Sequence, residues 1–345
     1  MNRLCVFVWP LFLVLQSCSL KEPSRNQTIS FSTFEKEDTI LFRDVYEFKE
    51  GVAGMMRLSD STLIIYNVSD GADHFLYNYS LEKGRLSSPY LKKGRGPGEA
   101  IGAAGIGISG NSLWIQDVTL KKLMTIDKNK AVNDCIFRVF NEYKVKDYPG
   151  RIDLKDSLHY FSTGFEDSDF RIQEFDLLLD QKTNEYAKYH SIPRDVSFDS
   201  FKSAHQTFIF SKPTGDKVVL PYRFMDAVGI FDIQTGQELI VHGPEGYEVK
   251  FKPLGKGMVR TAETRFAFVN GAMTNRYIYL SYSGMPCNTD QSSHGRSIYV
   301  YDWNGNPQRK LILNRLIESF VVTDDDRVLY AYDVNSGFLI QANIE

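Results

Sequence analysis

Aspartates recur along this chain in short polar segments that follow apolar runs, where their carboxylates would be able to hold a metal ion. These residues are Asp70, Asp73, Asp117, Asp167, Asp169, Asp226, Asp290 and Asp333. A ring of carboxylates offers the oxygen ligands that Ca²⁺ prefers. Aspartate also caps turns by accepting from backbone amides two residues on, and the chain has no D-x-D-x-D-G calcium loop. Turn capping and a divalent-cation site are therefore both open interpretations.

Arginines accompany these aspartates and suggest a second kind of chemistry. They are Arg95, Arg223, Arg260, Arg265 and Arg296, and the aromatic residues Phe165, Phe224 and Tyr247 stand among them. A guanidinium binds carboxylates and phosphates through two parallel hydrogen bonds. The set predicts a site for an anionic sugar or peptide. The alternative is a group of solvated charges paired with the aspartates.

The segment 283–296 holds the residues of a conceivable nucleophilic pair. It contains Cys287, Asp290, His294 and Arg296. A cysteine activated by a histidine is the usual form of such a pair, whereas a surface loop would contain the same residues without chemistry. The remaining histidines show no H-x-H or H-E-x-x-H spacing, so the sequence signals no zinc site.

Short apolar strands that recur at intervals of 45–60 residues must position these side chains. The strands begin at Leu63, Leu113, Leu158, Val218, Tyr277 and Val328. Each is preceded by a polar turn and followed by a second strand, which begins at His74, Lys122, Phe170, Ala227, Ser297 or Gly337. No long amphipathic helical pattern is present. A repeat of this length built from antiparallel strands predicts an all-β, six-bladed β-propeller with four-stranded blades.

The two ends of the repeat predict how the ring closes. The chain ends on the third strand of the last blade, while residues 39–48 precede the first blade without a blade of their own. We expect this N-terminal strand to become the outer strand of the last blade, which removes an exposed edge. Residues 29–345 then form one domain. Two separate β-sandwiches are the alternative.

The glycine-rich stretch LKKGRGPGEA at residues 91–100 contains Arg95 and Glu99 and raises a separate question. Glycines of this kind cradle phosphates when a helix follows them. Here a strand pattern follows, so we predict a crossover from the outer strand of one blade to the inner strand of the next. Residues 242–248, HGPEGYE, have a similar composition at the corresponding place after the fourth blade.

The N-terminal segment predicts export. Residues 1–17 carry Arg3 and an apolar run that is too short to span a bilayer, as in a secretory signal peptide. Leu15-Gln16-Ser17-Cys18 resembles a bacterial lipobox, which implies lipidation of Cys18 and a polar tether through residue 28. The alternative is an ordinary signal peptide. We expect the two cysteines of the mature chain that carry no lipid, Cys135 and Cys287, to be free thiols. The net charge of −3 gives no reason to expect nucleic acid.

Together the lipobox, the repeat and the G-R-G-P-G-E crossover at Gly94–Glu99 resemble the TolB-like six-bladed propeller lipoproteins. The blades are also weakly similar to NHL-type repeats, through Asp117 and Lys122. The resemblance implies a propeller attached by its lipid to a membrane of the cell envelope, with the outer membrane as the expected location. It implies no activity.

These observations favour a binding or scaffold module that holds a glycan, peptide or envelope protein at its loop face, without a cofactor. The expected ligand-binding residues are Arg95, Glu99, Asp117, Arg223, Asp226, His294, Arg296 and Asp333. A metal-assisted lactonase or lyase is the alternative, with Asp117, Asp226 and Asp333 as ligands of a cation such as Ca²⁺. A structural subunit of an envelope complex is a third possibility.

Overall fold

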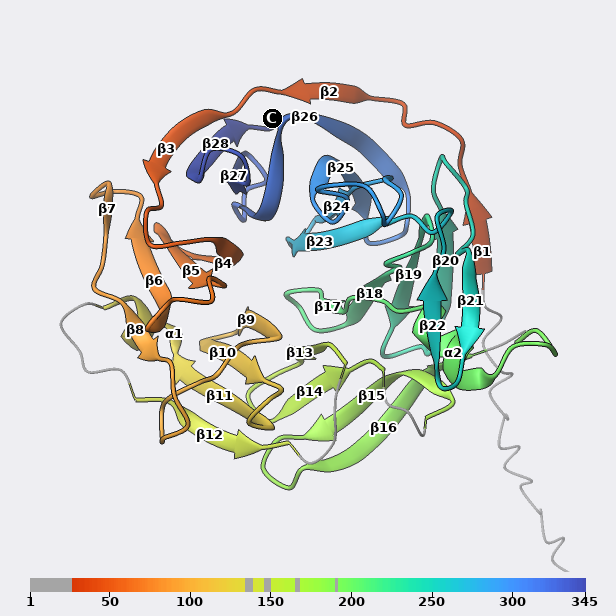
Figure 1. Cartoon of the computed structure of the whole chain (residues 1–345), viewed down its shortest axis with the longest axis horizontal. Coiled ribbons are helices and arrows are strands. Elements are labelled where there is room, and N and C mark those ends of the chain that lie inside the picture. Colours follow the sequence, from red (N-terminus) through yellow and green to blue (C-terminus); the bar gives the residue numbers. More distant parts are fainter. Residues whose placement is uncertain (1–26, 134–138, 146–149, 165–167, 190–191) are drawn as a thin grey trace, which may run out of the picture.

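The computed structural model describes residues 27–133, 139–145, 150–164, 168–189 and 192–345. Its strands are grouped in sheets around a central axis, as in a β-propeller (Figure 1). The predicted signal peptide, Cys18 and Cys135 lie outside the described residues, as do Phe165 and Asp167. The described part contains no helix that is long and apolar enough to cross a membrane.

Three blades follow one another from residue 53. Blade one comprises β4 (Ala53–Ser59), β5 (Thr62–Asn67) and β6 (His74–Ser80), with β7 (Arg85–Leu86) and β8 (Tyr90–Lys92) both paired to β6. Blade two comprises β9 (Gly105–Ser109), β10 (Ser112–Asp117), β11 (Lys122–Asp127) and β12 (Asn141–Lys144), with the short helix α1 (Lys128–Val132) after β11. Blade three comprises β13 (Ile152–Leu154), β14 (His159–Ser162), β15 (Phe170–Asp176) and β16 (Gln181–Lys188).

In the sequence, one insertion precedes blade four and a second one follows it. It comprises β17 (Phe210–Ser211), β18 (Lys217–Pro221), β19 (Ala227–Asp232) and β20 (Glu238–His242). Helix α2 (Phe198–Ala204) precedes it, and the separate hairpin of β21 (Phe251–Leu254) and β22 (Gly257–Arg260) follows it. Figure 1 shows α2 and the hairpin side by side at the edge of the ring, in agreement with the contacts between α2 and β22.

The last part of the ring is one eight-stranded sheet. Its strands are β23 (Phe268–Met273), β24 (Tyr277–Tyr282), β25 (Gly295–Asp302), β26 (Pro307–Val322), β27 (Val328–Asp333) and β28 (Phe338–Asn343), with β2 and β3 added from the N-terminal region. The 16-residue β26 pairs with β25 mainly through its first half and with β27 through its second half. The sheet therefore holds two sets of four strands that share β26.

An N-terminal strap, which we define as residues 27–47, runs along the outside of the ring (Figure 1). Strand β1 (Gln27–Ser30) pairs in parallel with β20, and β2 (Glu37–Ile40) pairs in parallel with β26. Strand β3 (Arg43–Glu47) pairs antiparallel with β28, which is the predicted junction of the two ends. The pairings of β1 and β2 were not expected from the sequence, and β1 includes Gln27 and Thr28 of the predicted tether.

Apolar layers lie between consecutive groups of strands and hold the ring together. Ile64 and Ile115 belong to the layer between blades one and two. Phe161 and Val218 belong to the layer between blades three and four. The central strands of a blade carry apolar residues on both faces of the sheet, because each blade packs against a neighbouring blade on either side. A side chain of this type contributes about 1.5–3 kcal/mol when it is fully buried.

The inner strands surround a central cavity of about 380 Å³. It is lined by residues of β4, β9, β13, β17, β23 and the second half of β26. Asp153 of β13 lies in this cavity and accepts a hydrogen bond from the Ser211 amide at 2.5 Å. Burial raises the pKa of Asp153 to about 6.

Candidate ligand-binding pocket

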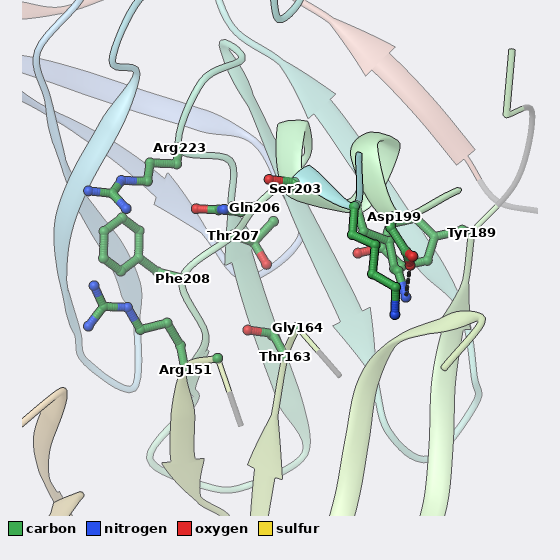
Figure 2. Close-up of a pocket in the computed structure, with 13 residues that line it drawn as sticks. Arg151, Thr163, Gly164, Tyr189, Asp199, Ser203, Gln206, Thr207, Phe208 and Arg223 are labelled. Carbon is green, nitrogen blue, oxygen red and sulfur yellow. Dashed lines mark ion pairs between the residues drawn. The ribbon is translucent and has the colours of Figure 1, made fainter. Parts of the chain in front are cut away.

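A pocket of about 360 Å³ opens between blades three and four (Figure 2). Thr163 and Gly164 follow β14, and Arg223 follows β18, so these residues come from the loops between the second and third strands of two adjacent blades. This is the face on which the sequence predicts ligand binding. The remaining lining residues are Gly150, Arg151, Tyr189, Asp199, Lys202, Ser203, Gln206, Thr207, Phe208 and Lys256.

Helix α2 forms one wall of the pocket and is anchored at both ends. The Ser197 side chain caps its N-terminus by accepting from the Ser200 amide at 3.2 Å. At the C-terminus the His205 amide donates to the Phe201 carbonyl at 3.0 Å. The rings of Phe198 and Phe201 pack edge-on against Tyr189, with centroids 5.6 and 6.1 Å apart. These contacts hold α2 against the end of blade three.

Arginine side chains and aromatic rings alternate at the opposite wall. Figure 2 shows Phe208 between Arg151 and Arg223. The Arg151 guanidinium lies 5.3 Å from the centre of the Phe208 ring. The guanidinium of Arg223 lies 5.5 Å from the centre of the Phe266 ring, and that of Arg260 lies 5.7 Å from the same ring. These cation–π contacts support the guanidiniums on apolar surfaces.

The guanidiniums of Arg151, Arg223 and Arg260 form no ion pair with another residue that the structure describes. Within the described ranges, no carboxylate lies within 4.0 Å of the guanidinium of Arg151, Arg223 or Arg260. Burial lowers the pKa of Arg223, and the positive charges of Arg151 and Arg260 lower it further. The wall therefore presents concentrated positive charge, which is the electrostatic requirement of an anion site.

A buried ion pair lies next to the pocket residue Tyr189. Arg171 of β15 donates to Glu238 of β20 and to the hydroxyl of Tyr222. The Arg171 guanidinium also lies 5.9 Å from the ring centre of Tyr189, which lines the pocket. Blades three and four are thus linked next to the site.

Of the predicted ligand-binding residues, Arg223 is the one that lines this pocket. Asp226 follows it closely in sequence but points into the crossover after blade four. Its Oδ2 accepts hydrogen bonds from the amides of Glu245 and Gly246 at 2.8 and 3.1 Å. Burial raises the pKa of Asp226 to about 6. A Cβ on Gly243 would lie 2.2 Å from its Oδ1, which explains a glycine there.

The carboxylates of Asp117 and Asp333 also accept hydrogen bonds from nearby groups of the protein. Asp117 is fully buried and accepts from the Ile101 amide at 2.7 Å and the Leu120 amide at 2.8 Å. Asp333 accepts from the Asn335 amide at 3.0 Å and from the Ser336 hydroxyl at 2.7 Å. The bonds from Leu120, Asn335 and Ser336 are of the turn-capping kind, whereas the bond from Ile101 ties Asp117 to the crossover from blade one. In the part of the chain that the structure describes, no three His, Cys, Asp or Glu side chains are grouped to hold a metal ion.

Glu99 and Arg95 lie on the crossover between blades one and two, away from the pocket. Glu99 accepts from the Gly96 amide at 2.8 Å, and a Cβ on Gly94 would collide with its carboxylate at 2.0 Å. Arg95 is exposed. The crossover continues into β9, so a strand and not a helix follows these glycines.

His294 and Cys287 have different partners. The Nε2 atom of His294 lies 2.8 Å from Glu318 Oε2, and this hydrogen bond raises the pKa of His294. Burial raises the pKa of the Cys287 thiol, although the Arg260 guanidinium acts against this. Cys287 is a free thiol, as predicted. Arg296 is exposed and does not line the pocket.

Three residues of the pocket, Arg151, Phe208 and Tyr189, were not predicted from the sequence. Arg151 stands just before an inner strand, and the other two lie in the crossover between blades three and four. They belong to the same kind of crossover as the predicted Arg95 and Glu99, but the sequence did not single them out. The length of this crossover, from the end of β16 at Lys188 to Phe210, was the available signal.

Comparison with known proteins agrees with this architecture. A family model described as TolB-like 6-blade propeller-like matches residues 30–325. The chain belongs to that family. No curated protein matched this TolB-like propeller.

Solved structures share its fold at low sequence identity. A protein of Bacteroides fragilis NCTC 9343, described as exported, is 14% identical with a TM-score of 0.56, and the match covers 92% of this chain and 99% of that one. The β-propeller domain of Cps50 (Swd1) from Myceliophteria thermophila is 12% identical with a TM-score of 0.51, and the match covers 88% of this chain and 100% of that one. Likeness at this level concerns the fold alone.

Proposed function

We propose that this TolB-like protein is an exported, lipid-anchored, six-bladed propeller that binds a glycan, peptide or protein partner at its loop face. The pocket between blades three and four is the proposed binding site. The sheets of blades one to four, together with the two halves of the eight-stranded sheet, support a count of six blades. Propellers position variable loops on a rigid scaffold, so the site rather than the fold carries the function.

The observation that carries this proposal is the pocket between blades three and four, at the predicted face. Its volume of about 360 Å³ falls in the range of small-ligand sites, roughly 300–1,000 Å³. Two aromatic residues, Tyr189 and Phe208, stand among polar side chains and glycines. Binding sites commonly combine such surfaces with a few polar groups that orient the ligand.

A substitution that fills the pocket tests the proposal. Gln206 is exposed at the pocket, so Gln206→Trp would obstruct it without entering the core. The full chain, purified in detergent, is titrated with panels of oligosaccharides and peptides by calorimetry. We expect a ligand that binds wild type and is lost in Gln206→Trp. Gln234→Trp, in the exposed turn after β19, is the matched control. Equal loss of binding in both variants would contradict the pocket assignment.

The lipid anchor is tested at Cys18. Acyl chains stabilise membrane attachment by about 0.8 kcal/mol per buried methylene group, so several chains give a firm anchor. We expect wild type to sediment with the outer-membrane fraction and to incorporate a labelled fatty acid, and Cys18→Ala to do neither. Labelling that persists in Cys18→Ala would contradict this part of the proposal.

The metal-assisted lactonase or lyase stays a prediction. Its proposed ligands Asp117, Asp226 and Asp333 bind backbone amides in this structure, so they do not favour it over binding. Mass spectrometry of the purified protein for stoichiometric Ca²⁺ or another divalent ion, in wild type and Asp117→Ala, tests this alternative.

A further inference from the structure

Two guanidiniums, of Arg151 and Arg223, line one side of the pocket, and that of Arg260 lies close by; none of the three has a carboxylate of the described residues within 4.0 Å. Arg151 stands on one side of Phe208 and Arg223 on the other, as Figure 2 shows. Arg260 extends the positive charge along Phe266. Placing like charges close together and partly out of water is unfavourable unless an anion joins them. Elsewhere among the described residues, many aspartates and glutamates pair with basic side chains, for example Lys155 with Glu174 and Arg276 with Asp326, whereas these three arginines have no such partner there.

The guanidinium N–H groups of Arg151 and Arg223 have few partners among the described residues, so they can donate to a ligand. Within the described residues the Arg151 guanidinium gives one hydrogen bond, to the Ala104 carbonyl, which leaves its other donors for a ligand. The Arg223 guanidinium makes cation–π contacts with Phe224 and Phe266 and no hydrogen bond within the described residues. A guanidinium held by aromatic contacts loses less conformational entropy when it binds an anion, and it matches carboxylate oxygens in pairs.

We propose that the pocket binds an acidic saccharide, whose carboxylate or sulfate group accepts hydrogen bonds from Arg151 and Arg223 at the edge of Phe208 while its ring packs against Phe208. This inference rests on the proposed function and specifies the ligand class of the same site. A sugar ring has an apolar C–H surface that suits an aromatic ring, and an aromatic side chain offers a large apolar contact area.

The rest of the lining favours a saccharide over an acidic peptide. Thr163, Ser203, Gln206 and Thr207 supply hydroxyl and amide groups that both donate and accept hydrogen bonds. Sugar hydroxyls need such mixed partners. Among the described lining residues there is no Val, Leu, Ile or Met side chain to receive a hydrophobic peptide side chain.

The test compares ligands that differ in charge alone. The full-length chain is titrated calorimetrically with short oligosaccharides of a uronic acid, with their neutral homologues, and with sulfated homologues. An acidic peptide and inorganic phosphate are run in parallel. The variants are Arg151→Gln, Arg223→Gln and Phe208→Ala. Arg85→Gln is the control because Arg85 is an exposed arginine of β7, on blade one. Circular dichroism melting checks that every variant is folded.

We expect the uronic or sulfated oligosaccharide to bind at least tenfold more tightly than the neutral one. The separate titrations with uronic and with sulfated oligosaccharides show whether the site prefers a carboxylate or a sulfate group. Arg151→Gln and Arg223→Gln should each weaken binding by about ten- to a hundredfold, as for a hydrogen bond to a charged group. Affinity should fall as salt is added. Phe208→Ala should weaken neutral and acidic sugars alike, and Arg85→Gln should match wild type.

Other outcomes overturn the inference in distinguishable ways. Equal binding of neutral and acidic sugars, lost in Gln206→Trp, would remove the anion subsite and leave the proposed binding function intact. Binding of the acidic peptide or phosphate without the sugars would replace the saccharide. Acidic sugars that bind equally to wild type, Arg151→Gln and Arg223→Gln would locate the site elsewhere. Failure of all probes, together with no effect of Gln206→Trp on any ligand, would contradict both proposals.

Discussion

Arg171 and Glu238 form an ion pair that is buried between blades three and four. Their side chains are 5% and 1% exposed. The pair lies next to Tyr189 and joins strands of different blades, so it supports the pocket as well as the ring. The contact explains why two charged residues occur within otherwise apolar strand patterns.

Removing one partner of this pair should destabilise the protein strongly. We expect Glu238→Ala to lower the free energy of unfolding by about 3–5 kcal/mol, because it leaves the Arg171 charge buried without its acid. The double variant Arg171→Met/Glu238→Leu should recover most of this loss. Urea denaturation measures both. Lys49→Ala, which removes an exposed pair with Glu47, is the control and should cost less than about 1 kcal/mol. A small effect of Glu238→Ala would contradict the burial of the pair.

The N-terminal strap should contribute to stability through its buried aromatic residues. The Phe34 ring is 6% exposed and lies 4.9 Å from the ring of Tyr299. We expect Phe34→Ala to lower the free energy of unfolding by about 3–5 kcal/mol, because it leaves a cavity between strap and blade. Leu41, on the same strap, is 73% exposed, so Leu41→Ala should change stability by less than about 0.5 kcal/mol. Similar melting temperatures for the two variants would show that the strap is not packed as described.

The carboxyl of Asp226 should make stability depend on pH. Its pKa in the folded protein is about 6, above the value of 3.8 for an unperturbed carboxyl. A group whose pKa is raised by folding stabilises the protein below its unfolded pKa, and this contribution is lost as pH rises through the folded pKa. Between pH about 4 and 6, wild type should therefore lose about 3 kcal/mol relative to Asp226→Asn.

Urea unfolding at a series of pH values measures this difference. Asp153 has a similarly raised pKa, so Asp153→Asn is a useful second variant. It should keep the contribution of Asp226 while losing its own. Parallel stability curves for wild type and Asp226→Asn across this range would argue against a buried carboxyl that is protonated at mildly acidic pH.

Two glycines of the crossover between blades one and two provide a matched comparison of backbone strain. Gly98 has a φ of +71°, while Gly102 lies outside the left-handed region, and a Cβ added at either position would have no heavy atom within 4 Å. Gly98→Ala should therefore cost about 1–2 kcal/mol through its backbone conformation alone. Gly102→Ala should change the unfolding free energy little. Equal denaturation midpoints would mean that the crossover relaxes to another conformation.

The core strands were predictable because their apolar residues are contiguous and bounded by turns. The segments that begin at Leu63 and Val218 became β5 and β18 with boundaries shifted by one residue. The pairing of residues 43–47 with the last strand was also predicted, since an unpaired edge had to be covered. The sequence of β1 has no apolar alternation from which a strand could have been predicted. All four of its residues are exposed, and it is held by backbone pairing and not by an apolar face.

The pocket was harder to predict for a different reason. Arg223 was expected on the loop face, and it lies there. Its neighbours Arg151 and Phe208 approach it only because two blades and an inserted helix meet, which is a tertiary relationship without a local sequence period. Asp117 and Asp226 were chosen for their chemistry. They hold the crossovers through backbone amides, a role that is indistinguishable from ligand binding when residue types alone are known.

Because β3 and β28 are neighbours in the ring, the final blade cannot be assembled from residues that are synthesised together. Strand β3 is synthesised early and can pair with β28 only after the end of the chain has been made. Closure of the ring therefore joins segments that are separated by most of the polypeptide. Contacts of such long sequence separation are slow to form. Until β28 is made, the inner strands of the last sheet present an unpaired edge, and a nascent or truncated chain would be vulnerable there to aggregation and proteolysis.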